Sequence, residues 1–444
     1  IAESWETGPD GTQYLFHLRK NAKFSNGDPI TAKDFVYSFR RGFSPALASR
    51  NAYLGYYIKY SEAYNSDRSF VKDKSGNFLL KADLEPKKDG GQVTEPAAAQ
   101  SAGFGADTEF NKYIKGPERL TVPSDKKERD ALLAKDAKLS AAVQGKEFVP
   151  VKPEDIGVEA IDDYTLRLTL YQPAPFFLGL LSHQYFRVVP EKVIEKYGDQ
   201  WTRTENIVTS GPFKLAVHRP YDVLKVVRDP NYWDAANVKL DGIEFYPLDE
   251  ATTMMNLYKA GSVDALYNHT VPAAWFDEIK QFTAEYSLQP EVADEFYVIN
   301  VKRPPMDNLK VRKAFALAID RVSLAKFRKT LKPLVDMTPE GIFPKYEEAR
   351  EKVYSEELKK QGSSLEEWKA RIFEPEKARK LLTEAGFPVT PSGDGFACPS
   401  FPVDKVNITY NTAESNKAVA EFIQAQWKQN LGITVPLKNM EFRT

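Results

Sequence analysis

The sequence predicts an α/β protein built from two or three domains. Segments that alternate like strands recur between amphipathic segments with helical spacing, most regularly between residues 295 and 444. Strand–helix–strand units at this spacing favour layers of helices packed on sheets. The chain has 444 residues, which is too long for one ordinary hydrophobic core, and so more than one domain is expected.

The first forty residues predict a strand, a turn and a capped helix in direct succession. Residues 14–19 (YLFHLR) alternate between an apolar face and a mixed face, the pattern of a half-buried strand. Residues 26–29 (NGDP) are a strong turn signal. Thr31 and Asp34 resemble a capping box in which Asp replaces the usual Glu or Gln, so a helix is expected to start there.

Residues 61–153 have a different composition and predict a long surface excursion. The segment is polar, is rich in Ala, Gly and Pro, and shows no sustained hydrophobic period. Within it, residues 124–143 predict one helix capped by Ser124. We expect the charges of this helix to form a solvated face.

Regular patterns resume near Ile156. A turn at residues 162–163 precedes a strand that places Leu166, Leu168 and Leu170 on one face. Pro190 is well placed near a helix start, and Gly261 is a C-capping residue for a helix that begins at residue 251. Further strands are expected at residues 221–228, 242–248 and 263–268.

The last third repeats strands and helices in turn. A helix at residues 308–321 has Leu309, Val311, Phe315, Ala318 and Ile319 as its apolar stripe. The other expected elements are strands at residues 295–300, 406–411 and 433–442 and helices at residues 374–385, with Gly386 just past its end, and 415–432.

The composition excludes several classes of protein. Lys and Arg number 61 and Asp and Glu 62, so no basic surface for nucleic acid is indicated. No apolar run reaches the roughly 18 residues that a membrane-spanning helix needs. The single cysteine, Cys398, excludes an intramolecular disulfide and a thiolate metal cluster.

The sequence carries no recognisable catalytic motif. Its four histidines, at positions 17, 183, 218 and 269, form no i,i+4 pair, and GxSxG, Walker and GxGxxG patterns are absent. His269 is the one histidine that we would examine for contact with a ligand. We therefore expect a binding protein that is not an enzyme and that has no catalytic residue, no metal and no cofactor.

Blocks of sequence in a fixed order carry a resemblance to a known family. The first block runs from AESW through FHLRK to DFVYS, and later blocks are TSGPF, RDPNYWD and RPPMDNLKVRKAFALAIDR. Together they resemble the extracellular solute-binding proteins of family 5, the oligopeptide- and dipeptide-binding proteins of ABC importers. Outside residues 61–153 the resemblance covers most of the chain.

This resemblance implies a two-lobed periplasmic-binding-protein-like α/β fold with an extra domain beside lobe one. Residues 1–189 would form the extra (wedge) domain, with an insertion at residues 61–153. Residues 190–288 would form the central part of lobe one, and residues 289–444 the first part of lobe two. Because no export segment precedes Ile1 and the pattern is interrupted at Thr444, we expect a piece that lacks both ends.

The resemblance also implies a function. Oligopeptides would be captured between the two lobes and delivered to an ABC permease in the membrane, in the periplasm or from a lipid anchor outside the cytoplasmic membrane. We expect a monomer that does not bind nucleic acid. In oligopeptide-binding relatives the acidic residue that pairs with the ligand's amino terminus would lie beyond Thr444, so we expect the isolated chain to bind peptide poorly.

Candidate ligand-binding residues follow from the same resemblance, position by position. They are Ser210, Gly211, Tyr267, Asn268, Phe296, Tyr297, Asn300, Asn411 and Thr412. Ser210 and Gly211 are candidates for backbone contacts. Only one of Phe296 and Tyr297 is expected to face a ligand, since neighbouring residues of a strand point to opposite sides.

Other ligands and functions stay open at this point. The same fold serves nickel chelates, haem and oligosaccharides. A floor of Trp residues in the cleft would favour an oligosaccharide, and a cluster of Arg or His would favour a chelate. A hydrolase with two carboxylates in the cleft is a third hypothesis. A fourth is an adhesion or sensing protein, for which the segment at residues 61–153 is the only motivation.

Overall fold

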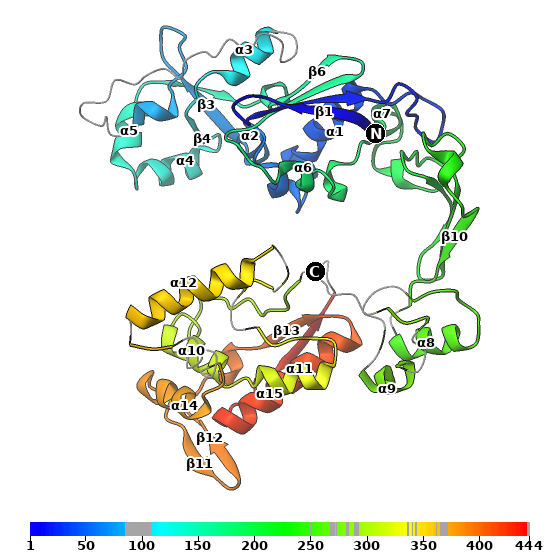
Figure 1. Ribbon diagram of the computed structural model, residues 1–444. Helices are drawn as coiled ribbons and strands as arrows, with labels where there is room; N and C mark the ends of the chain where they lie inside the picture. Colours follow the sequence, from blue (N-terminus) through cyan, green and yellow to red (C-terminus); the bar gives the residue numbers. More distant parts are fainter. Residues whose placement is uncertain are drawn as a thin grey trace. The chain divides into compact units, whose positions relative to one another are not determined.

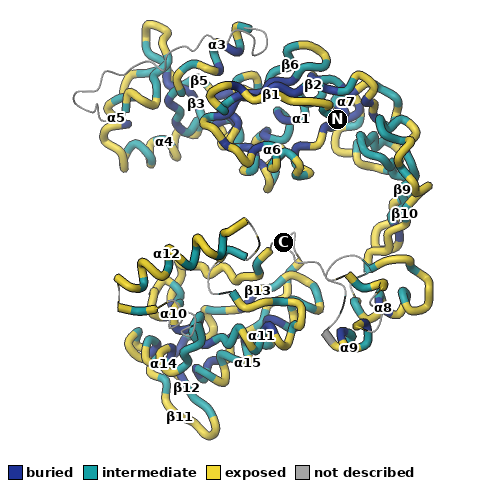
Figure 2. Tube along the Cα trace, viewed as in Figure 1, coloured by how far each residue is buried: buried dark blue, intermediate teal, exposed yellow. Residues whose placement is uncertain are grey.

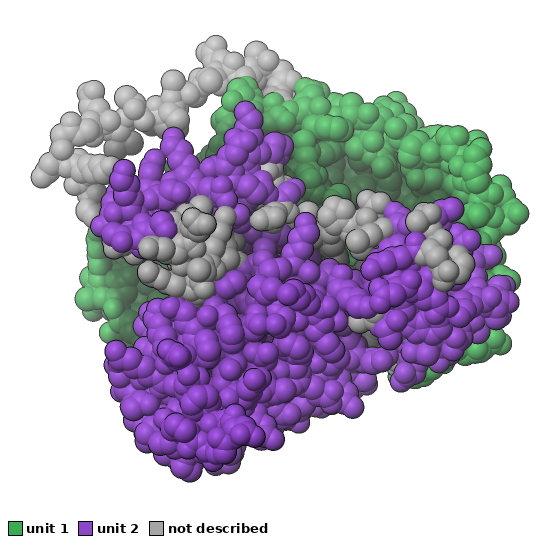
Figure 3. Space-filling view, turned by 60° about the horizontal axis from the view of Figure 1, so that its bottom comes forward, with its two compact units in different colours: residues 1–247 green, residues 248–444 purple. Residues whose placement is uncertain are grey.

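The computed structural model describes most of the chain. It covers residues 1–84, 108–248, 250–266, 271, 273–280, 284–287, 293–334, 337–339, 341, 344–360, 362–364 and 372–441. The chain divides into two compact units, Ile1–Pro247 and Leu248–Thr444, which Figure 3 shows in different colours. Each unit is described by itself, and the division at residues 189 and 288 expected from the sequence stays a prediction.

The centre of unit 1 is a four-stranded antiparallel sheet with the order β1-β2-β7-β6. Its strands are β1 (Ala2–Thr7), β2 (Gln13–Leu18), β7 (Thr165–Thr169) and β6 (Val158–Asp162). Helices α1 (Ala32–Gly42) and α6 (Phe177–Leu180) lie on one side of this sheet (Figure 1). The main apolar core of the unit joins Tyr14 and Phe16 of β2 to Phe39 of α1 and Phe177 of α6.

The capping box expected at the start of α1 is confirmed. The carboxylate of Asp34 accepts hydrogen bonds from the backbone N–H and the hydroxyl of Thr31, both at 2.8 Å. Both groups therefore have a partner although they precede the first helical turn. Leu166, Leu168 and Leu170 share the core face of the sheet as expected.

The expectation that β2 is only half-buried is wrong. Leu15, on the opposite face from Phe16, is also buried, as are Gln13 beside it and Arg167 and Thr169 on β7. Figure 2 shows β2 as largely buried. The sheet register pairs Gln13 with Thr169 and Leu15 with Arg167. This second face is covered by α3 (Glu109–Lys115), which follows Leu15 by almost a hundred residues in the sequence.

Within residues 61–153 the described part is folded and has cores of its own. It contains α2 (Ser61–Asn65), α3 and a three-stranded sheet, β4-β3-β5, with the strands Arg68–Lys72 (β3), Thr121–Pro123 (β4) and Glu147–Pro150 (β5). The single helix capped by Ser124 was a wrong prediction. Asp125 and Asp136 cap two shorter helices, α4 (Lys126–Leu133) and α5 (Ala137–Val143), and α5 buries Leu139 and Val143.

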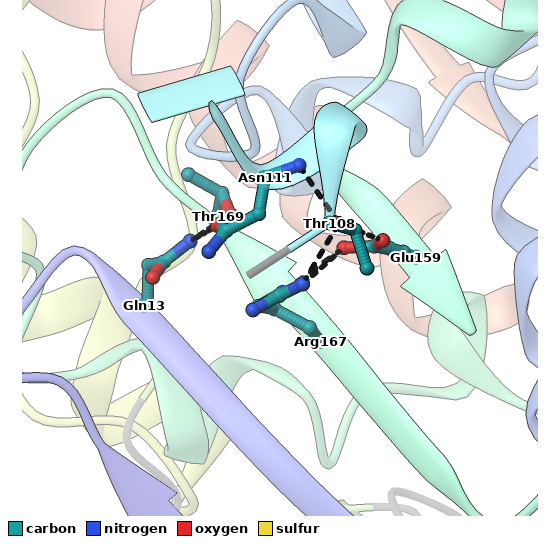
Figure 4. A network of polar contacts seen from close by, with 6 residues as sticks. All are labelled: Gln13, Thr108, Asn111, Glu159, Arg167 and Thr169. Carbon is teal, nitrogen blue, oxygen red and sulfur yellow. Dashed lines mark hydrogen bonds and ion pairs between the residues drawn. The ribbon is translucent and has the colours of Figure 1, made fainter. Parts of the chain in front are cut away.

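Helix α3 is attached to the sheet by buried polar side chains (Figure 4). The amide of Gln13 donates to Asn111 on α3 at 2.8 Å and to Thr169 at 2.9 Å. The guanidinium of Arg167, 1% exposed, contacts Glu159 at 2.6 Å and the hydroxyl of Thr108, the N-cap of α3, at 3.2 Å. Buried polar groups without partners are costly, so these contacts specify one position for α3.

The rest of unit 1 follows the expected order with shorter elements. Pro190 is the N-cap of α7 (Glu191–Tyr197). A three-stranded antiparallel sheet, β10-β9-β8, contains β8 (Phe213–Arg219), β9 (Val223–Arg228) and β10 (Gly242–Phe245). Strand β8 had not been predicted, whereas β9 and β10 lie inside the segments that were expected to be strands.

Unit 2 contains the parallel strand–helix–strand crossover that the sequence predicts. Strand β13 (Ile408–Asn411) pairs in parallel with β14 (Leu437–Met440), and α15 (Glu414–Leu431) connects them. The apolar core of unit 2 joins this crossover to α10 (Leu309–Leu317) and α14 (Pro375–Glu384). The other α-helices and strands among the described residues are α8 (Ala251–Lys259), α9 (Phe276–Ile279), α11 (Arg321–Arg328), α12 (Tyr346–Lys360), β11 (Thr390–Ser392) and β12 (Gly395–Ala397).

Two segments of unit 2 that were predicted to be strands form none within the described residues. Residues 295–300 and the described residues 263–266 belong to no strand. A strand needs a neighbouring ladder of backbone hydrogen bonds, and within the described ranges no strand pairs with either segment. The apolar stripe of α10 is confirmed at Val311 and Phe315, but Leu309 is exposed.

A buried lysine holds the other end of α3. The ammonium of Lys59 donates to the carbonyl oxygens of Ile114 and Gly116 at 2.7 and 2.6 Å. Cations are favourable at the C-terminal end of a helix, where carbonyl groups lack helical partners. Burial nevertheless lowers the pKa of Lys59 to about 8, because the charged form loses its hydration.

The depressed pKa of Lys59 predicts a pH-dependent stability. Between pH 8 and the ordinary value of 10.5, the unfolded chain binds more protons than the folded chain, so folding becomes more favourable as pH rises. Wild type should therefore gain stability relative to Lys59→Met over this range, by no more than about 3 kcal/mol and less where solvent screens the charge. Urea denaturation of both proteins across the range measures this. A difference in unfolding free energy between the two proteins that does not change with pH would contradict the lowered pKa of Lys59.

Candidate functional site

The loop at residues 209–212, between α7 and β8, carries the candidates Ser210 and Gly211. Both backbone groups of Thr209 are held by Ser25: the N–H of Ser25 donates to the Thr209 carbonyl at 2.8 Å, and the Thr209 N–H donates to the Ser25 hydroxyl at 3.0 Å. At the other end of the loop, the carbonyl of Pro212 accepts from the N–H of Asp229 at 2.9 Å. The loop is therefore fixed at both ends.

Two residues that follow β9 support this arrangement. Asp229 is fully buried, and its Oδ1 accepts from the N–H of Asn231 at 2.9 Å. The side chain of Asn231 in turn donates to the carbonyl of Ser25 at 3.0 Å. The FSNGDP, TSGPF and RDPNYWD segments, distant in the sequence, thus meet at one place in unit 1.

Between the fixed ends, Ser210 and Gly211 offer backbone donors. Both residues are half-buried, and within the described part of the chain neither N–H has a hydrogen-bond partner. A Cβ atom added at Gly211 would meet no atom within 4 Å. Two backbone N–H groups without partners can donate to carbonyl or carboxylate oxygens of a ligand.

Asn411 and Thr412 lie at the carboxyl end of the parallel strands of unit 2. The N–H of Thr412 donates to the Met440 carbonyl at 3.2 Å, and its hydroxyl donates to Asn439 at 2.9 Å. The side chain of Asn411 is exposed, and α15 begins three residues later. In open α/β sheets this end of the strands is where ligands bind.

Phe296, Tyr297 and Asn300 lie in the irregular segment of unit 2 that was expected to be a strand. The side chains of Phe296 and Tyr297 are 56% and 38% exposed. Burial, and then the charge of Glu295, raise the pKa of Tyr297 to about 12, so its hydroxyl stays protonated and can donate. The expectation that strand alternation would separate Phe296 from Tyr297 has no basis without a strand. The side-chain oxygen of Asn300 accepts from the N–H of Lys302 at 3.1 Å.

The remaining candidates, Tyr267 and Asn268, lie outside the described residues together with His269. Of the described candidates, Ser210 and Gly211 lie in unit 1, whereas Asn411 and Thr412 lie in unit 2. All nine residues stay candidates.

A group of exposed aromatic side chains in unit 1 was not anticipated. The rings of Tyr57 and Phe176 meet edge to face at 5.1 Å, and Phe176 is 55% exposed. Tyr53, four residues before Tyr57, is 60% exposed. Exposed aromatic residues that contact one another are enriched at binding surfaces. In the sequence, these residues were visible only as the aromatic residues of segment 53–57 and of the PFF sequence that ends at Phe177. Neither segment has a hydrophobic period from which exposure could be predicted.

Other kinds of site find no support in the part of the chain that the structure describes. It contains no group of three or more His, Cys, Asp or Glu side chains that could hold a metal ion. His17 contacts Glu6 at 2.8 Å across β1 and β2, and His183 caps a short helix, so both have structural partners. None of the described helices is both long enough and apolar enough to cross a membrane.

Comparison with known proteins gives consistent matches over the whole chain. The family model of bacterial extracellular solute-binding proteins, family 5 (middle), matches residues 1–444. The periplasmic oligopeptide-binding protein OppA of Salmonella typhimurium is 28% identical over 449 residues, and OppA of Haemophilus influenzae is 29% identical over 451 residues. A probable deoxycholate-binding periplasmic protein of Escherichia coli, YgiS, is 27% identical over 445 residues. Each match covers 100% of this chain and 63% of the relative.

Crystal structures give the same answer for the fold. The oligopeptide-binding protein OppAIV of Borrelia burgdorferi matches with a TM-score of 0.66 at 28% identity, over 100% of this chain and 66% of that chain. OppA of Haemophilus influenzae in complex with RPPGFSPFR matches with a TM-score of 0.64 at 26% identity, over 100% and 67%. The predicted fold class, an α/β fold of the periplasmic-binding-protein type, is confirmed. The chain spans about 63% of the length of the curated relatives.

The open space at Gly211 predicts how the loop tolerates substitution. Gly211→Ala should change the free energy of unfolding by less than about 0.5 kcal/mol, as surface substitutions usually do. Gly157→Ala is the contrasting variant in the same unit, because its Cβ would lie 2.5 Å from the carbonyl oxygen of Thr169. It should cost about 1–3 kcal/mol. Thermal unfolding of both variants tests the pair, and equal losses would show that the space at Gly211 is filled.

Proposed function

Because the chain belongs to the bacterial extracellular solute-binding proteins of family 5, we propose that it captures oligopeptides outside the cytoplasmic membrane for import by an ABC permease. The observation that carries the proposal is the match of the entire chain to a Haemophilus influenzae protein whose crystal structure contains the peptide RPPGFSPFR. The Salmonella typhimurium and Haemophilus influenzae relatives, each matched over 100% of this chain, are named as periplasmic oligopeptide-binding proteins. The protein acts as a monomer in the periplasm or on a lipid anchor.

Recognition of many peptides requires contacts to the groups that all peptides share. The N–H groups of Ser210 and Gly211 are suited to a ligand carbonyl because they are fixed in position and lack partners within the described residues. Asn411 and Thr412 provide polar groups at a strand end in unit 2. Each hydrogen bond contributes only about 0.5–1.5 kcal/mol net, so a peptide must make several at once.

The proposal assigns no reaction and no cofactor to the protein. It is supported by the family, whose members are named for binding a solute. The balanced charge of the sequence, −1 in 444 residues, does not favour a nucleic-acid partner.

A second candidate ligand is a bile acid. The relative YgiS is named as a probable deoxycholate-binding protein and matches this chain almost as well as the oligopeptide-binding proteins do. A rigid apolar ring system with one carboxylate would use the exposed aromatic side chains of Tyr53, Tyr57 and Phe176 in place of backbone contacts.

Native mass spectrometry of the full-length protein purified from its own cells tests the proposal. Co-purified ligand, released and fragmented, should give a ladder of short peptides of mixed sequence. A single bile-acid mass would replace the peptide by the second candidate. A haem, metal-chelate or oligosaccharide mass would overturn both ligands while leaving the family assignment intact.

A further inference from the structure

We propose that Ser25 is a positioning residue that sets the direction of the Ser210 N–H group for contact with a ligand carbonyl. This inference rests on the proposed function, because it assigns a role in peptide binding to a residue that need not touch the peptide. Ser25 precedes Thr209 by 184 residues, and nothing in the sequence near TSGPF points to it.

The geometry of the peptide group carries the argument. The carbonyl of Thr209 and the N–H of Ser210 belong to one planar trans peptide unit, so they point in opposite directions. The Thr209 carbonyl accepts from the N–H of Ser25 at 2.8 Å. The Ser210 N–H must therefore point away from Ser25, and rotation of this peptide unit would break the bond.

The hydroxyl of Ser25 restricts the preceding peptide unit in the same way. It accepts from the Thr209 N–H at 3.0 Å, so Ser25 holds the backbone on both sides of the Thr209 Cα atom. The Thr209 hydroxyl adds a bond to the Phe213 carbonyl at 3.2 Å. A donor that is already oriented loses less conformational entropy when a ligand binds than one on a free loop.

Ser25 can impose this direction because it is itself immobilised. It follows Phe24, which is buried, and it precedes the tight turn at residues 26–28. Across this turn the N–H of Phe24 donates to the carbonyl of Asp28 at 2.8 Å. Asn231 holds its carbonyl from the other side at 3.0 Å.

Asp229 also supports the loop, and its contacts indicate that its role is to hold neighbouring groups in position. It is fully buried, and within the described residues Oδ2 has no hydrogen-bond partner. A buried carboxylate with one unpaired oxygen destabilises the folded state. Its other contacts orient Asn231 and the carbonyl of Pro212, so the energetic cost is tolerated where both ends of the loop are fixed.

The test compares Ser25→Ala with a matched control, Ser38→Ala. The Ser38 hydroxyl likewise accepts a backbone N–H from a distant residue of unit 1, that of Val189 at 2.9 Å, but it is not part of the loop. Both variants of the full-length protein lose the acceptor of a backbone N–H. Ser38→Ala also loses the hydroxyl's bond to the Asp34 carbonyl at 2.6 Å, so its loss of thermal stability should be at least as large. Affinity for trialanine, measured by calorimetry, should fall about tenfold in Ser25→Ala and stay within about twofold of wild type in Ser38→Ala.

Amide hydrogen exchange provides a readout that stability alone does not move. In wild type, trialanine should slow the exchange of the Ser210 N–H. Ser25→Ala keeps the backbone bond to the Thr209 carbonyl but loses the hydroxyl's bond to the Thr209 N–H, so at saturating peptide this protection should be weaker. Ser25→Thr, which keeps a hydroxyl, should restore it. Equal affinities for wild type and Ser25→Ala, or equal losses in both alanine variants, would overturn the positioning role. Failure of wild type to bind any peptide would instead overturn the proposed function.

Discussion

The structure of unit 1 depends on one constraint, that polar groups removed from water must find partners within the protein. The main apolar core of the unit packs on one face of its central sheet. On the other face, α3 is held at its start by Arg167, Glu159 and Thr108, in its middle by Gln13, and at its end by Lys59. These bonds are directional, so they define where α3 lies more narrowly than apolar contacts would.

The same constraint identifies the candidate site, because two backbone N–H groups there have no hydrogen-bond partner within the described residues. Three residues beside the loop at residues 209–212 are engaged in hydrogen bonds: Ser25 with Thr209, Asn231 with Ser25, and the N–H of Asp229 with Pro212. The N–H groups of Ser210 and Gly211 have no partner within the described residues. A binding protein for varied peptides needs rigid donors that are not already used, and a loop fixed by its flanks provides them.

Local chemistry could be predicted from the sequence, and distant partners could not. The capping box of Thr31, the start of α7 at Pro190 and the β13–α15–β14 crossover each depend on neighbouring residues, and all were predicted correctly. The burial of Leu15 on the face that α3 covers could not be read from its neighbours in the sequence. Within the described residues, no strand pairs with residues 295–300, which their alternation predicted to be a strand. Ser210 and Gly211 were named as candidates by resemblance, but the residues that fix them are up to 206 positions apart.

The central claim is that recognition is directed at the peptide backbone. Calorimetry of the full-length protein with trialanine, side-chain variants of this peptide and variants with N-methylated amides tests it most directly. The account predicts that exchanging side chains changes affinity by only a few fold, whereas methylating one central amide lowers it by up to about tenfold, the equivalent of one lost hydrogen bond. Strong dependence on side chains together with indifference to N-methylation would contradict it.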